Sequence, residues 1–272
     1  MLCLTGPITV RSGQLIATAG VGRFDVGRSN NACFSRVARI RRFDKLQILF
    51  RPRPDRSGFA FSIILGSSML ELVVGSGNAH KIAELRALLP RDRFRLIPLS
   101  ELETPLDVEE TGLTFCENAR LKATLQAKHL NRWVLAEDSG LEVDALSGQP
   151  GVFSARFAGR HGDDVANNLK LLKEMADFPS GMRGASFRCF VCVSSPQGIA
   201  RIEVNDVCRG RIGTEPQGEG GFGYDPLFII PEYHQSFGQL GVTIKNVLSH
   251  RSRALRKVVP RLLELVASGE FA

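Results

Sequence analysis

The stretch AEDSGLEVDAL, residues 136–146, places two adjacent acids directly after an apolar run. The run, Trp133 to Ala136, predicts a short buried strand, and Ser139 with Gly140 predicts a sharp turn at its end. Neighbouring carboxylates in an open turn repel each other unless a cation lies on them. Mg²⁺ binds oxygen ligands and keeps several waters. The stretch therefore predicts a magnesium site at the carboxyl end of a strand.

Strand and helix patterns alternate on both sides of this stretch, from Met69 to the end of the chain. Short apolar runs predict strands at 70–74, 94–99, 133–136, 185–194, 199–210 and 227–230. Helical periods and capping signals predict helices at 81–89, 114–130, 163–175 and after Ser249. Thr114 and Glu117 form a capping-box pattern, and Pro260 is a point at which the last helix could kink. We expect an α/β fold with a mixed sheet.

Charge is distributed unevenly along the chain. The 272 residues carry a net charge of +7, with 43% hydrophobic and 23% charged residues, which is ordinary for a globular protein. Residues 1–68 hold ten Arg and one Lys against three Asp, a net charge of +8, whereas the remainder holds 24 basic and 25 acidic residues. A nucleic-acid-binding domain would place its basic stripe in the folded part. We therefore expect no nucleic-acid partner.

The apolar runs and the cysteines indicate in which cellular compartment the protein works. The run from Phe59 to Leu70, about 12 residues broken by Ser and Gly, is too short to span a bilayer. The six cysteines are scattered, unlike the disulfide framework of a small secreted protein. We expect reduced thiols, a cytoplasmic location and no membrane partner. Cys189 and Cys192 form a CxxC pattern within a predicted strand, and a separation of three puts their sulfurs on opposite faces.

Residues 1–68 show no clear strand or helix pattern, and three interpretations of them are open. The first is a disordered tail, since their charged, Pro-broken composition buries little apolar surface. The second is a transit-like peptide, rich in Arg and poor in acids. The third is a start codon assigned upstream of the true one at Met69. We favour the third, because Met69 directly precedes the first predicted strand, which makes 69–272 the functional domain.

Four further motifs accompany the acidic pair. They are SGNAHK at 76–81, GVFSAR at 151–156, GGFGYDPLF at 220–228 and SHR at 249–251. In this order and spacing, the chain from Leu70 to about Leu265 resembles the Ham1-like inosine triphosphate pyrophosphatase family. The resemblance implies an elongated mixed sheet flanked by helices, with two lobes and an active-site cleft between them. It also implies hydrolysis of ITP, dITP and XTP to the monophosphate and pyrophosphate, with Mg²⁺ as cofactor and a homodimer as the working form.

The resemblance assigns roles to individual residues. It implies that Asp138 is the catalytic residue and a metal ligand, that Glu110 is a second ligand, and that Glu137 assists. The implied substrate-binding residues are Ser76, Gly77, Asn78, Ala79, His80, Lys81, Ser139, Phe222, Gly223, Tyr224, Asp225, Lys245, His250 and Arg251. General chemistry agrees for two of these groups. A polar turn that leads into a helix binds anions through free amides, and an aromatic ring beside glycines can stack on a base.

Base selection is predicted to come from Phe222 and Arg251. An Arg side chain has donors only, so it favours a 6-oxopurine over a 6-aminopurine. Two alternative functions stay open. One is a pyrimidine-directed nucleotide pyrophosphatase, and the other is a nucleotide- or RNA-binding module that uses the basic N-terminal segment. Turnover in the presence of Mg²⁺ would separate an enzyme from a binding module.

Overall fold

The computed structural model describes residues 69–271 and, before them, the backbone of six strands. These strands are β1 (Ile8–Arg11), β2 (Gln14–Ala17), β3 (Phe24–Asp25), β4 (Val37–Ile40), β5 (Phe43–Pro52) and β6 (Phe59–Leu65). They form two three-stranded antiparallel sheets, β1–β2–β3 and β4–β5–β6. The chain divides into two compact units, Met1–Met69 and Leu70–Ala272. The three interpretations of residues 1–68 depend largely on parts of the segment outside the described residues, and they stay predictions.

The second unit is built on a mixed seven-stranded sheet in the order β13–β12–β11–β10–β9–β7–β8. Its strands are β7 (Leu70–Val74), β8 (Phe94–Pro98), β9 (Val134–Val143), β10 (Gly184–Ser194), β11 (Ala200–Ile212), β12 (Phe228–Ile230) and β13 (Gln235–Ser236). β7 runs parallel to both β8 and β9, and the other neighbouring pairs are antiparallel. The predicted α/β fold with a mixed sheet is confirmed.

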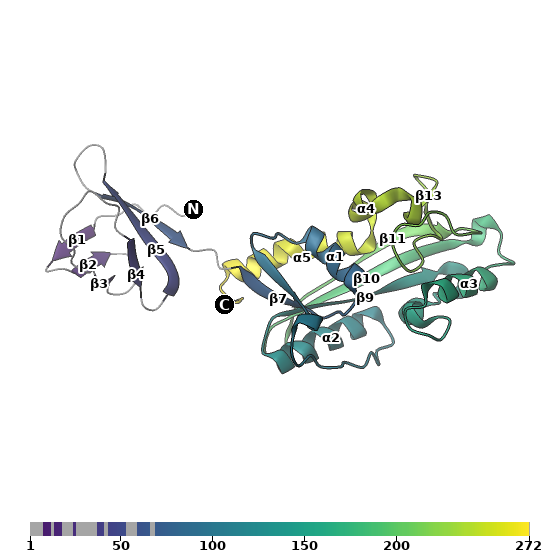
Figure 1. Cartoon of the computed structure of the whole chain (residues 1–272), viewed down its shortest axis with the longest axis horizontal. Coiled ribbons are helices and arrows are strands. Elements are labelled where there is room, and N and C mark those ends of the chain that lie inside the picture. The colour runs from purple at the N-terminus through teal and green to yellow at the C-terminus, as the bar shows by residue number, and fades with distance from the viewer. Residues whose placement is uncertain are drawn as a thin grey trace. The chain divides into compact units, whose positions relative to one another are not determined.

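Helices cover both faces of this sheet (Figure 1). They are α1 (Ala79–Leu88), α2 (Phe115–Leu130), α3 (Asp164–Glu174), α4 (Phe237–Leu248) and α5 (His250–Ala267). α1 and α5 bury their apolar sides on one face, against residues such as Leu135 and Val191. α2 packs on the opposite face, where its alanines contact Ala136 and Cys192. The central strands are therefore covered on both faces, which explains their nearly continuous burial.

Two separate hydrophobic cores lie along the same strands and define two lobes. In one core, Leu135 of β9 and Val191 of β10 pack with α1 and α5. In the other, Leu141 of β9 and Phe187 of β10 pack with α3 and α4. Between the two cores, β9 carries the polar residues 137–139. The polar tract is thus positioned by apolar packing on either side of it along one strand.

The predicted turn at Ser139 and Gly140 is wrong. β9 continues through both residues to Val143, and it pairs with β10 without interruption from Val134 to Val143. The glycine is required by packing, since a Cβ at Gly140 would lie 2.4 Å from the Ser154 Oγ. The acidic pair therefore lies in the middle of a strand, where its surroundings are more enclosed than a turn would make them.

Helix ends follow their capping residues closely. α1 begins at Ala79, two residues before the predicted start, because the Asn78 Oδ1 accepts from the amides of His80 (3.0 Å) and Lys81 (3.2 Å). The capping box at Thr114 is confirmed, as is the cap of the last helix by Ser249. Pro260 lies inside α5, which nevertheless continues as one helix from His250 to Ala267.

The described residues include both cysteines of the CxxC pattern and all five α-helices of the second unit. Cys189 and Cys192 are free thiols, and they belong to cores on opposite faces of the sheet, as predicted. Among the helices of the described residues, none combines the length and apolar character that a bilayer span requires.

Candidate active site

The candidate site lies along the middle of β9, where this strand has a free edge. β7 ends at Val74, opposite Leu135, and from there β9 pairs only with β10 among the described strands. Gly75 follows β7 and donates a backbone hydrogen bond to the Leu135 oxygen (2.8 Å). A Cβ on Gly75 would lie 2.9 Å from the Ala136 Cβ, so the chain passes close to β9 here. The loop into α1 therefore starts beside the acidic pair.

Glu137 and Asp138 point to opposite faces of the sheet, because side chains alternate along a strand. Glu137 contacts residues of α1 and α5, whereas Asp138 contacts residues of α2. Both carboxylates are buried, with relative exposures of 1% and 6%. Two neighbouring acids thus avoid direct repulsion by occupying separate environments, and each has its own cationic partners.

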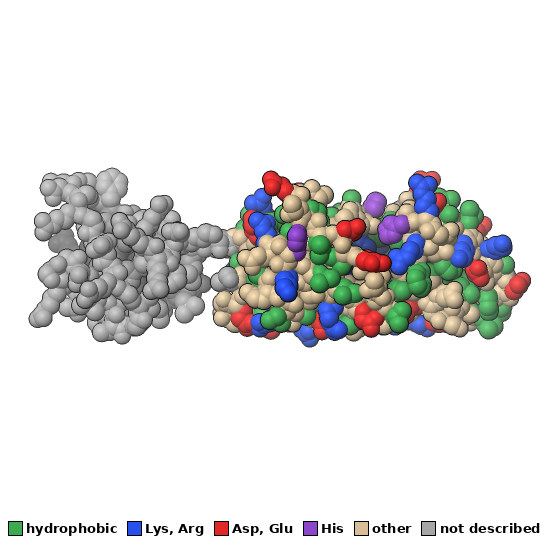
Figure 2. All heavy atoms as spheres, turned by 90° about the horizontal axis from the view of Figure 1, so that it is seen from below, with side chains coloured by type: hydrophobic (Ala, Val, Ile, Leu, Met, Phe, Trp, Pro, Cys, Tyr) green, Lys and Arg blue, Asp and Glu red, His purple; other side chains and the backbone are tan. Residues whose placement is uncertain are grey.

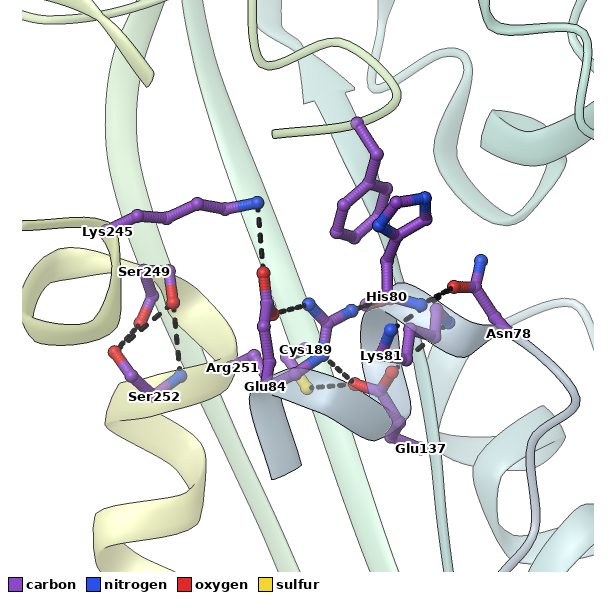
Figure 3. A network of polar contacts seen from close by, with 12 residues as sticks. Asn78, His80, Lys81, Glu84, Glu137, Cys189, Lys245, Ser249, Arg251 and Ser252 are labelled. Carbon is purple, nitrogen blue, oxygen red and sulfur yellow. Dashed lines mark hydrogen bonds and ion pairs between the residues drawn. The ribbon is translucent and has the colours of Figure 1, made fainter. Parts of the chain in front are cut away.

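Glu137 is held by a fixed set of donors on the α1 and α5 face (Figure 3). Its Oε2 accepts from Arg251 Nε (2.9 Å) and from the Cys189 thiol (3.1 Å), and Lys81 Nζ lies 3.2 Å from Oε1. Burial alone would raise the pKa of Glu137, but the charges of Arg251 and Lys81 outweigh it and hold this pKa far below the usual range. Glu137 is therefore an ionised anchor with little capacity to take up a proton.

Asp138 has a different environment on the α2 face. Asn118 Nδ2 donates to its Oδ2 (3.2 Å), and Lys122 Nζ lies 3.2 Å from its Oδ1. The same Lys122 ammonium lies 2.8 Å from the Glu110 Oε1. Burial raises the pKa of Asp138, and the negative charge of Glu110 adds to the rise, although Lys122 opposes it. Asp138 is thus the acid of the pair with the greater affinity for a proton.

Lys81 connects the two faces electrostatically. Its positive charge lowers the pKa of Glu137 and Glu110, and it counters the rise at Asp138. Lys81 lies in the first turn of α1, which follows the loop 75–78, and Gly77 to His80 are exposed. The Asn78 side chain bonds the first amides of α1, and Ser76 Oγ accepts from the Asn78 amide (3.2 Å). This end of α1 presents its dipole and a lysine beside the acids, which suits an anion.

A chain of buried ion pairs leads from Glu137 to a second cluster. Arg251 Nη1 donates to Glu84 of α1, and Arg251 Nη2 donates to the Ser139 Oγ (3.1 Å). Lys245 Nζ lies 3.0 Å from the Glu84 Oε1 and 2.6 Å from the Asp225 Oδ2. Burial would raise the pKa of Glu84, but Arg251 and Lys245 hold it below its usual value.

On the face in Figure 2, acidic, basic and histidine side chains gather near the middle of the described surface.

Phe222 forms the aromatic part of this second cluster. Its ring stacks on His80, with centroids 5.2 Å apart, and the Lys245 Nζ lies 4.3 Å from the ring centroid. The Phe222 amide donates to the Asp225 Oδ2 (2.8 Å), which ties the loop to Lys245. The half-buried ring therefore lies between the start of α1 and the charged cluster.

Two other predicted residues of this region are buried. The Tyr224 hydroxyl donates to the Ser154 oxygen (2.9 Å). His250 stacks on Phe187 at 4.9 Å, and its Nδ1 has no hydrogen-bond partner among the described residues. Burial and the charge of Arg251 hold the pKa of His250 well below its usual value, so the ring is neutral. Although His250 precedes Arg251 in the sequence, its ring lies in the apolar core of the second lobe and not in the charged cluster.

Sequence reasoning missed Glu84, Lys122 and Asn118. All three lie on helices that carry several polar residues, so the local pattern does not distinguish them from solvent-exposed positions. Helical spacing contained a signal: Glu84 follows Lys81 by three residues, and Lys122 follows Asn118 by four. Such spacings put both members of a pair on one side of their helix, facing the same strand.

Buried acids, lysines and a helix N-terminus at one strand edge define an α/β protein that is suited to bind a phosphorylated ligand. The chain belongs to the Ham1 family, whose model matches residues 72–261. It is 60% identical over 200 residues to a dITP/XTP pyrophosphatase of Rhodopirellula baltica, across 74% of this chain and 96% of the relative. A dITP/XTP pyrophosphatase of Desulforamulus reducens is 46% identical over 197 residues, across 72% of this chain and 97% of the relative.

Solved structures agree with this family. A HAM1 protein from Coxiella burnetii superposes with a TM-score of 0.66 at 39% identity, over 72% of this chain and all of the other. The family resemblance predicted from the sequence motifs is confirmed, and so is the mixed sheet flanked by helices that it implied.

Proposed function

We propose that this chain is a nucleoside triphosphate pyrophosphatase that hydrolyses non-standard purine nucleotides. The substrates are ITP, dITP and XTP, the products are the monophosphate and pyrophosphate, and the reaction removes these nucleotides from the pool. The observation that carries the proposal is the buried acid Asp138, which lies 3.2 Å from the Lys122 ammonium and is also influenced by the charge of Lys81 in the first turn of α1. The names of the relatives at up to 60% identity support the same reaction.

In this proposal Asp138 accepts the proton of the attacking water. Asp138 suits this role better than Glu137, because the Glu137 carboxylate is already held by Arg251, Lys81 and Cys189. Lys81, Lys122 and the exposed N-terminal end of α1 bind phosphate oxygens and stabilise the charge that develops on the leaving pyrophosphate. Glu137 keeps Lys81 and Arg251 in place, because it stays ionised.

The residues around Lys122 fit the Mg²⁺ that the sequence predicts. Glu110 and Asp138 both direct a carboxylate oxygen at one cation, the Lys122 ammonium, and hard oxygen donors are what Mg²⁺ binds. Glu137 fits less well, since Arg251 and Cys189 already occupy its Oε2. Bound Mg²⁺ would lower the pKa of water and neutralise phosphate charge. We therefore assign Glu110 and Asp138 as the ligands.

Base recognition is assigned to the second cluster. Phe222 offers a ring face for stacking, and Gly223 lets the backbone approach the base. The Lys245 Nζ and the Arg251 Cζ lie 4.3 Å and 5.7 Å from the centroid of this ring, and Tyr224 and Asp225 hold the loop that carries it. His250, whose ring is packed on Phe187, is not part of this cluster. Three of the five N–H groups of Arg251 already donate to protein atoms, which leaves two for a substrate oxygen.

The test is a panel of nucleoside triphosphates, with pyrophosphate release as the readout. We expect ITP, dITP and XTP to exceed ATP in kcat/KM by about a hundredfold, since an amino group at position 6 leaves buried donors unpaired. Preference for a pyrimidine would instead support a pyrimidine-directed enzyme. Binding without turnover in the presence of Mg²⁺ would overturn the assignment and favour a binding module.

Two further proposals concern the setting of the reaction. We propose a homodimer, as the family resemblance implies, and a cytoplasmic location, which agrees with the free thiols of Cys116, Cys189, Cys192 and Cys208. Light scattering of the purified protein tests the first. Fractionation of cells that express the full chain tests the second.

A protein that begins at Met69 is expected to match the full chain in activity and melting temperature. The hydrophobic cores of the second unit, and every proposed site residue, lie within 70–271. Pyrophosphate release and thermal unfolding of the two proteins, measured side by side, check this. A melting temperature lower by many degrees, or loss of turnover, would show that residues 1–68 belong to the functional domain.

A further inference from the structure

Both polar groups of the Gly223 backbone are bound by side chains of α3. The Gly223 amide donates to the Asp164 Oδ2 (2.7 Å), and the Asn168 Nδ2 donates to the Gly223 oxygen (2.8 Å). These contacts join segments that are 59 and 55 residues apart in the sequence. Gly223 directly follows Phe222, so α3 fixes the backbone next to the aromatic ring.

The two side chains are arranged for this contact by α3 itself. Asp164 and Asn168 are four residues apart, which puts them on the same side of the helix. Asp163 caps the helix through the Ala166 amide, so Asp164 is not needed as the cap. The Asn168 Nδ2 also donates to the Asp164 oxygen (2.8 Å), which leaves each of its two hydrogens with a carbonyl partner. We refer to Asp164 and Asn168 as the α3 clamp.

Phe222 is then restrained on both sides along the chain. Its own amide donates to Asp225, which is paired with Lys245. The following residue, Gly223, has a φ of +62°, a left-handed conformation that a glycine adopts without strain, and the α3 clamp bonds both of its polar groups. A free loop could rotate this peptide and swing the ring away from His80, whereas the clamp opposes that rotation.

We propose that Asp164 and Asn168 are positioning residues that set the Phe222 ring for the purine base. The proposal rests on the proposed function, because it assumes that Phe222 stacks on the base. Neither side chain has a described contact with the acids of β9, so the clamp acts on base binding and leaves the hydrolytic step unaffected. Its loss therefore raises KM and weakens the preference for ITP over ATP, with little change in kcat.

The experiment compares kcat and KM for ITP and ATP in the full-length protein and its variants. We expect about a tenfold rise in KM for ITP in Asp164→Ala, the value of one charge-assisted hydrogen bond. Asp164→Asn keeps an acceptor for the Gly223 amide and should restore most of the affinity. Asn168→Ala, which removes the other half of the clamp, should act in the same direction as Asp164→Ala.

Asn167→Ala is the matched control. Asn167 is a buried neighbour on α3 that bonds the Ala158 amide and the Ala155 oxygen, and it has no described contact with Gly223. It should lower the melting temperature and leave KM near the wild-type value. If Asn167→Ala raised KM as much as Asp164→Ala, or if Asp164→Asn failed to restore affinity, the clamp would be only structural and the proposal would be wrong.

Phe222→Ala separates this proposal from the one that it rests on. A raised KM in Phe222→Ala with an unchanged KM in both clamp variants would overturn the α3 clamp alone. An unchanged KM in Phe222→Ala would instead show that this ring does not bind the base, and the assignment of the base site would fail with it. A fall in kcat at constant KM in the clamp variants would also contradict the proposal.

Discussion

The Asp138→Asn variant is expected to lose turnover by about a thousandfold or more, the usual contribution of a general base. Asparagine keeps the shape of the side chain but can neither take a proton nor offer a charge to a metal. The fold should persist, because Lys122 still has Glu110 as a partner and the buried site loses a charge whose desolvation is costly. Pyrophosphate release from ITP and the melting temperature are the two measurements.

A control for this variant lies on the same strand. Glu142 is half-buried and paired with Arg188 at 3.0 Å, outside the proposed site. Glu142→Gln removes one charge from β9 in the same way and should keep nearly full turnover. If Asp138→Asn were as active as Glu142→Gln, Asp138 could not be the base. If Asp138→Asn lost turnover together with much of its thermal stability, misfolding would have to be separated from catalysis first.

The Arg251→Ala variant is expected to lower the free energy of unfolding by about 3–5 kcal/mol and to remove most of the activity. Arg251 is 1% exposed, and its guanidinium bonds Glu137, Glu84 and Ser139 at once. Its removal leaves the buried Glu137 and the partly buried Glu84 with one fewer cation each, and a buried charge without its partner is the costly case. Urea unfolding at neutral pH measures the loss.

Lowering the pH should reduce the difference in the free energy of unfolding between the wild type and Arg251→Ala. In the wild type the pKa of Glu137 is depressed, so its ionised form contributes stability that is present above the unfolded-state pKa and lost as pH falls through the folded value. In the variant, burial dominates and favours the protonated acid. The gap in unfolding free energy should therefore be largest near neutral pH and shrink below the ordinary carboxylate range.

Two variants sharpen the interpretation of Arg251. Arg251→Lys restores a charge but not the three-way hydrogen bonding, so it should recover part of the stability and little of the activity. Arg253→Ala, next to it on α5, removes a bond to the Val207 oxygen and should cost much less. Base selection is tested in the same proteins: if Arg251→Ala keeps the full ITP/ATP ratio in kcat/KM, Arg251 does not select the 6-oxo group.

Local patterns were sufficient to predict most elements of the fold. Thr114 and Ser249 cap their helices through contacts within a few residues, so the starts of these two helices follow from nearby sequence. α4 was missed because Gly241, with a φ of +74°, interrupts it and shortens its pattern. Lys245, which lies on α4, was therefore assigned to the site although no helix was predicted around it.

The site was predictable as a set of residues, but its geometry was not. A serine followed by a glycine is typical of a turn. In this chain the glycine at position 140 is needed instead because the Ser154 side chain approaches the strand there, which only the structure shows. The partners of the acids come from distant helices, and Glu84 meets Arg251 across 167 positions of sequence. Sequence spacing within one helix cannot show which strand that helix will cover, so Lys122 could not be matched to Asp138 in advance.

Because Glu137 and Asp138 point to opposite faces of the sheet, the register of β9 determines which acid meets which partners. A one-residue slip of a strand moves every side chain to the other face. An insertion or deletion between Val134 and Asp138 would thus send Asp138 towards Arg251 and Cys189, and a neighbouring side chain towards Lys122. Such a change would leave nearly all of the sequence intact, yet it would exchange the proposed proton acceptor, Asp138, and the ionised Glu137. Lengthening this strand by a single residue is therefore a more severe alteration than most substitutions within it.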